Sequence, residues 1–69
     1  MTGWQGNQSM QAAEIQSYAR QMFEAQGERA IVTAAEKAYQ FERSGDTEQA
    51  QLWRRIEAAL MLLRGPRET

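Results

Sequence analysis

The sequence predicts an all-α protein, a small three-helix domain built on an antiparallel helical hairpin. Three segments carry apolar residues at intervals of three and four, which is the repeat of one helix face. A short turn, Ser44–Asp46, separates the last two segments, and short connections favour antiparallel neighbours. We expect residues 1–8 to form a flexible lead, 9–65 the domain and 66–69 a tail.

The first helix is expected over about residues 9–25. Ser9 is a suitable N-cap and Gly27 a suitable terminator. Polar residues occupy the opposite side, so the segment is clearly amphipathic. Its apolar face comprises Ile15, Tyr18, Ala19, Met22 and Phe23.

The second helix is expected over about residues 28–43. Alanine fills several positions of its apolar face, so a neighbouring helix can approach closely. We expect Phe41 to join the core and Tyr39 to remain the most exposed ring, since a boundary tyrosine keeps its hydroxyl in water. The apolar face comprises Ala30, Ile31, Ala34, Ala35, Ala38 and Phe41, flanked by Val32 and Tyr39.

In the turn before the third helix, one residue can end the second helix and the next residue can cap the third. Gly45 can adopt the left-handed conformation that closes a helix. Asp46 can accept hydrogen bonds from the next turn, and Gln49 occupies the position of a capping-box partner.

The third helix should therefore run over about 47–64, ended by Gly65 and Pro66. Met61 and Leu62 lie off its apolar face, on opposite sides of it. Surplus apolar surface of this kind indicates a contact site. The apolar face itself comprises Leu52, Trp53, Ile56, Ala59, Leu60 and Leu63.

Size and composition limit the possible functions. A chain of 69 residues has room for one domain with a marginal core, and it contains neither cysteine nor histidine. Disulfides and the usual ligands of zinc, haem and iron–sulfur clusters are thus missing. Oligomerisation or docking onto a larger partner is the remaining source of support for so small a domain. No cofactor or metal site is predicted.

Charge and hydropathy argue against a nucleic-acid-binding protein and against a membrane-spanning one. Eight basic and nine acidic residues give a net charge of −1, without the basic excess of a nucleic-acid binder. The longest uncharged apolar run, 58–63, is far too short for a membrane span. The start shows no signal-peptide pattern, so we expect a cytoplasmic protein. The sequence also has no phosphate loop, nucleophile elbow or metal-ligand spacing, so no catalytic residue is predicted and we expect no enzyme.

Two resemblances accompany these patterns. Ala38, Phe41, Gly45-Asp46 and Ala50 resemble the turn of a tetratricopeptide repeat, but the first half of that motif is missing. Most of the chain, from Tyr18 to Pro66, resembles a group of short alphaproteobacterial helical proteins, which implies a bacterial cytosolic protein and three helices but no activity. This resemblance rests on Tyr18-Ala19-Arg20, Gly27…Ala30, Ala34-Ala35-Glu36-Lys37-Ala38, Gly45-Asp46, Trp53-Arg54-Arg55-Ile56…Ala59 and Arg64-Gly65-Pro66.

The sequence thus predicts a non-enzymatic protein-interaction module, either self-associating or an accessory subunit of a larger bacterial assembly. The alternative is a small dimeric regulator that contacts nucleic acid, in which two copies combine Arg54, Arg55, Arg64 and Arg67. Trp4 is a further candidate anchor for a partner, because tryptophan is enriched at interface hot spots. The residues expected to bind a protein partner are Trp53, Arg54, Arg55, Met61, Leu62 and Arg64.

Overall fold

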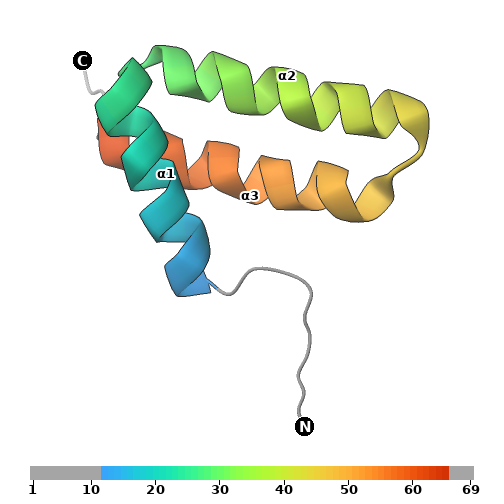
Figure 1. Cartoon of the computed structure of the whole chain (residues 1–69), viewed down its shortest axis with the longest axis horizontal. Coiled ribbons are helices and arrows are strands. Elements are labelled where there is room, and N and C mark those ends of the chain that lie inside the picture. The colour runs from blue at the N-terminus through green and yellow to red at the C-terminus, as the bar shows by residue number, and fades with distance from the viewer. Residues whose placement is uncertain (1–11, 66–69) are drawn as a thin grey trace, which may run out of the picture.

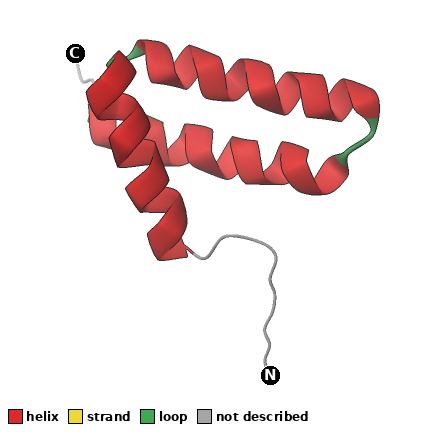
Figure 2. Ribbon diagram, in the orientation of Figure 1, coloured by secondary structure: helices red, strands yellow, loops and turns green. Residues whose placement is uncertain are grey.

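The chain reverses direction at Gly45 and Asp46, so that α2 (Arg29–Ser44) and α3 (Thr47–Arg64) pack as an antiparallel hairpin (Figure 1). The first helix, α1 (Ala12–Gln26), crosses the hairpin near its open end. The computed structural model describes residues 12–65, and this part of the chain contains helices and short connections only (Figure 2). The predicted all-α hairpin architecture is confirmed.

The helix bounds agree with the sequence prediction to within one residue wherever they can be compared. α3 has the predicted limits, α2 begins and ends one residue later than expected, and α1 ends at Gln26 rather than Ala25. The predicted start of the first helix at Ser9 lies outside the described residues. So do the lead with Trp4 and the tail with Arg67.

The turn between α2 and α3 satisfies backbone groups of both helices at once. Gly45 has a φ of 87°, and its N–H donates to the Glu42 carbonyl oxygen at 3.3 Å. The Asp46 N–H donates to the Phe41 carbonyl oxygen at 2.9 Å, which completes a Schellman motif. The Asp46 carboxylate then accepts from the Gln49 N–H at 3.3 Å and caps α3. The cap is confirmed, while the Asp46 N–H that a full capping box would use is occupied by Phe41.

The turn between α1 and α2 is built differently. Gly27 has a φ of 65°, and its N–H donates to the Phe23 carbonyl oxygen at 2.7 Å. α2 begins after Glu28, whose side chain makes no capping hydrogen bond. A hydrogen bond of 2.9 Å from the Thr33 hydroxyl to the Gln26 side-chain oxygen spans the turn instead. It links the last residue of α1 to the second turn of α2.

The core lies where the three helices meet, and it is built largely from small side chains. Within residues 12–65, five of the nine buried residues are alanines, and Ile56 and Leu60 are the only large side chains that are fully buried. Phe23, Trp53 and Leu63 cover this core as half-buried neighbours. Every residue of the three predicted apolar faces is buried or half-buried except Tyr18, which is 40% exposed. The buried residues are Ile15, Ala19, Met22, Ala30, Ala34, Ala38, Ala50, Ile56 and Leu60.

Candidate interaction surface

Trp53, the first of the predicted partner-binding residues, lies at the junction of α1 and the hairpin. Its ring contacts the edge of Tyr18 in a T-shaped pair, with 5.9 Å between ring centroids. The Lys37 ammonium lies over the same ring, also at 5.9 Å from the centroid. Trp53 is half-buried and Tyr18 is 40% exposed. Both rings therefore pack within the chain and still present an edge to solvent.

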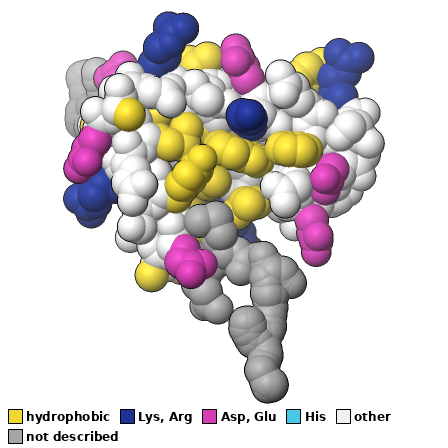
Figure 3. Space-filling model, viewed as in Figure 1, with side chains coloured by type: hydrophobic (Ala, Val, Ile, Leu, Met, Phe, Trp, Pro, Cys, Tyr) yellow, Lys and Arg dark blue, Asp and Glu magenta, His cyan; other side chains and the backbone are white. Residues whose placement is uncertain are grey.

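Apolar side chains gather on the α1 side of the hairpin, as Figure 3 shows. There they form a band along the hairpin beside α1, with charged side chains around it. The large side chains that pack against the buried core are only half-buried and therefore remain in contact with solvent; they are Phe23, Ile31, Leu52, Trp53 and Leu63.

Arg54 is engaged by carboxylates of its own chain. Its Nε and Nη2 atoms donate to the two carboxylate oxygens of Glu42 in α2, at 3.0 and 3.2 Å. Its Nη1 donates to Glu57 one turn along α3, at 3.0 Å, which makes an i, i+3 ion pair. These hydrogen bonds, the one with Glu42 first, raise the pKa of Arg54 above its ordinary value. Arg54 thus remains cationic and ties α3 to the last turns of α2.

The other predicted residues fall on two sides of α3. Arg55 and Leu62 are seven residues apart and share one side, whereas Met61 lies on the side of Arg54. Leu62 is 77% exposed and Met61 is 44% exposed. Arg64 lies nine residues from Arg55, so the two guanidinium groups lie on opposite sides of the helix. With Arg54 already paired, the described arginines of α3 do not converge as phosphate binding requires.

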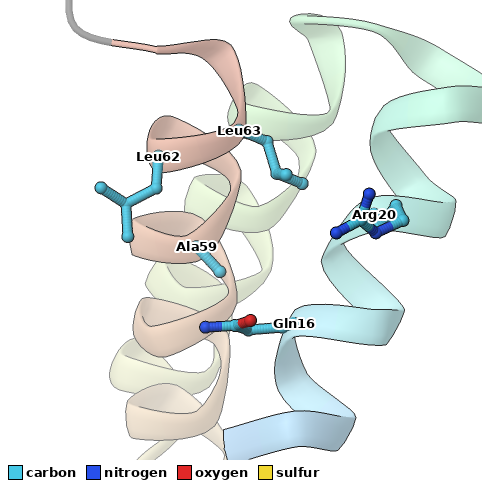
Figure 4. Close-up of a pocket in the computed structure, with 5 residues that line it drawn as sticks. All are labelled: Gln16, Arg20, Ala59, Leu62 and Leu63. Atoms are coloured by element: carbon cyan, nitrogen blue, oxygen red, sulfur yellow. The ribbon is translucent and has the colours of Figure 1, made fainter.

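A small cleft separates α1 from the end of α3. Ala59 and Leu63 project toward α1 in Figure 4, and Gln16 and Arg20 form the opposite wall, while Leu62 lies at the outer rim. The cleft has a volume of about 120 Å³. Clefts that enclose small-molecule ligands usually have roughly 300–1,000 Å³. Its size and lining suit contact with a protein side chain better than capture of a metabolite.

A second exposed apolar surface lies on α2 and was not assigned as a site from the sequence. Val32 is 54% exposed and Tyr39 is 55% exposed, which confirms Tyr39 as an exposed ring. A shallow groove runs along these residues, lined by Ile31, Val32, Ala35, Glu36, Tyr39 and Gln40. We call the four apolar residues Ile31, Val32, Ala35 and Tyr39 the outer face of α2. The seven-residue spacing of Val32 and Tyr39 could have revealed it, since that spacing places both on one side of a helix.

The outer face of α2 is bounded by charges at its two ends. Toward the helix start, a neighbouring groove continues past Val32 to Glu28, Arg29 and Arg64. Toward the helix end, the Arg43 guanidinium lies over the Tyr39 ring, at 5.7 Å from the centroid. The strip therefore has Glu28 at one end, in a groove that Arg29 and Arg64 also line, and Arg43 at the other end.

The described surfaces offer apolar and charged side chains for contact with another protein. Within residues 12–65, no group of carboxylates is arranged to hold a metal ion, and no polar side chain is buried. No helix of the described chain is both long and apolar enough to cross a membrane. Comparison with known protein families, curated proteins and solved structures finds no match to this chain.

Proposed function

We propose that this chain is a non-enzymatic protein-interaction module of the bacterial cytoplasm, which acts by burying exposed apolar side chains against a protein. One observation carries the proposal. The described residues leave five large apolar side chains exposed, while only four large side chains are buried. Exposed apolar side chains that share one face mark interaction sites in small proteins, and Val32 and Tyr39 share one face of α2. The exposed five are Tyr18, Val32, Tyr39, Met61 and Leu62.

The proposed surface for a different protein partner lies on the second half of α3. Leu62 is its most exposed apolar side chain and borders the cleft lined by Ala59 and Leu63. Arg55 lies on the same side of α3 as Leu62, two turns earlier, whereas Met61 and Arg64 lie on other sides of the last turns. Arginine and methionine are enriched at protein interfaces. A partner that inserts a side chain into the cleft and extends over its outer rim would also cover Leu62, the most exposed of these apolar side chains.

Aspartate at Leu62 or Met61 tests this surface. The full chain is used to capture partners from source cells, and the mass of each complex is measured by light scattering on a size-exclusion column. We expect Leu62→Asp to reduce capture about tenfold or more, with a smaller loss for Met61→Asp. Helicity by circular dichroism should be unchanged, because the Leu62 side chain already lies in water.

Gln21→Asp, an equivalent change at an exposed position of α1, is the matched control. It should capture partners as well as the unmodified chain does. Equal capture by the unmodified chain, Leu62→Asp and Met61→Asp would show that this surface is wrong. A chain that captures nothing and stays monomeric at all concentrations would contradict the interaction function as a whole.

A further inference from the structure

We propose that the outer face of α2 pairs with the same face of a second copy of this chain, as an antiparallel two-fold dimer. The proposal concerns a surface other than the α3 surface. It rests on the proposed function only in that both act by protein contact. The argument comes from the spacing of the apolar residues and from the charges at the two ends of the strip.

The spacing of the strip fits helix-to-helix packing. Val32, Ala35 and Tyr39 are separated by three and four residues, the alternation that forms the seam of two packed helices. One helical turn beyond each end of the strip, four residues before Val32 and four after Tyr39, lie Glu28 and Arg43. These two charged residues therefore terminate the seam, roughly 22 Å apart along the helix. Grooves along the face join Glu28 to Gln40 through Ile31 and Val32.

The positions of Glu28 and Arg43 favour one direction of pairing between two copies. In a two-fold interface each residue meets its counterpart reciprocally. An antiparallel pair centred between Ala35 and Glu36 places Val32 against Tyr39 of the other copy. The same pairing places Glu28 against Arg43 of the other copy, twice. A parallel pair would instead place Glu28 against Glu28 and Arg43 against Arg43, which is repulsive.

The end groups are available for such contacts. Glu28 is exposed and makes no side-chain capping hydrogen bond. Arg43 is exposed and lies over Tyr39, so it can keep that contact and reach a carboxylate above it. Glu28 also lies at the positive end of its helix dipole and Arg43 at the negative end. Both charges are thus compatible with the isolated chain and with the pair.

Charge exchange provides the sharpest test. Sedimentation equilibrium of the full chain should show a monomer–dimer equilibrium. Glu28→Arg and Arg43→Glu should each weaken the homodimer about tenfold, because each variant creates two like-charge contacts. Mixing the two variants should restore a heterodimer as tight as the unmodified dimer, since both contacts are then opposite in sign. Glu24→Arg, at an exposed position of α1, is the matched control and should dimerise normally.

Two further substitutions probe the centre of the interface. Val32→Asp should weaken the dimer about a hundredfold, with unchanged helicity because the side chain is more than half exposed in the single chain. Glu36 lines the same groove and would lie next to its counterpart beside the two-fold axis. Glu36→Gln should therefore tighten the dimer.

The outcomes separate this inference from the proposed function. A chain that remains monomeric at millimolar concentration overturns the dimer, and so does a dimer that the charge exchanges leave unchanged. A dimer lost with Leu62→Asp but retained with Val32→Asp overturns the α2 seam in favour of the α3 surface. If the mixture restores dimerisation while Leu62→Asp captures partners normally, the dimer stands and the α3 surface is wrong.

Discussion

Asp46 serves two helices with two different groups. Its backbone N–H closes α2 by donating to the Phe41 carbonyl oxygen, and its carboxylate opens α3 by accepting from the Gln49 N–H. The preceding Gly45 supplies the positive φ that brings these groups together. Because both functions meet in adjacent residues, the turn needs no additional loop residues.

Removing the Asp46 carboxylate should destabilise the domain. We expect Asp46→Ala to lower the free energy of unfolding by about 1 kcal/mol, the usual cost of losing an N-cap. Asp46→Asn should be nearly neutral, since the amide oxygen accepts the same hydrogen bond. Urea unfolding followed by circular dichroism measures both. Equal stability of the alanine and asparagine variants would show that the cap contributes nothing.

At the scale of the elements, alanine decides how α2 and α3 meet. Ala30, Ala34 and Ala38 recur every four residues and are fully buried. Such a row of small side chains lets the backbone of α3 approach α2 closely. Because the buried residues of α2 are all alanines, the large side chains between α2 and α3 come from α3, as Ile56 and Leu60.

Enlarging the alanine row should force the helices apart. Ala34→Leu is expected to cost about 1–3 kcal/mol of stability through overpacking, measured by thermal unfolding at low protein concentration. Ala25→Leu, the same change at an exposed position of α1, is the control and should leave stability nearly unchanged. If Ala34→Leu proved as stable as the unmodified chain, the close approach of α2 and α3 would be disproved.

At the scale of the whole molecule, Leu60 and Leu62 show which apolar side chains stabilise the single chain and which do not. Leu60 is fully buried, whereas Leu62, two residues later on the same helix, is 77% exposed. A domain of this size has a small margin of stability, about 3–5 kcal/mol from a single core. Exposed side chains such as Leu62 add nothing to that margin until a partner covers them.

Alanine at Leu60 should lower the free energy of unfolding strongly, whereas alanine at Leu62 should hardly change it. Leu60→Ala removes a core side chain and should cost about 2–5 kcal/mol, enough to unfold much of the population at room temperature. Leu62→Ala should change stability by less than about 0.5 kcal/mol. Circular dichroism against temperature distinguishes them. Similar losses for both would mean that Leu62 belongs to the core.

The sequence alone determined the comparable helix bounds to within one residue and most of the inward face of each helix, because caps and apolar spacing act over a few neighbouring residues. Gly45, Asp46 and Gly65 end and begin helices without reference to the rest of the chain. The exposure of Leu62 and Tyr39 followed from the same local periodicity, because each lies off the inward face of its helix.

Only the tertiary structure decided which groups from different helices meet. It paired Arg54 with Glu42, twelve residues earlier, and formed the cleft between α1 and α3. It also left the outer face of α2 uncovered, because α1 crosses near the open end of the hairpin and the inward row of alanines faces α3. Periodicity places a side chain on one side of its own helix, but the packing of the other helices determines whether that side is buried.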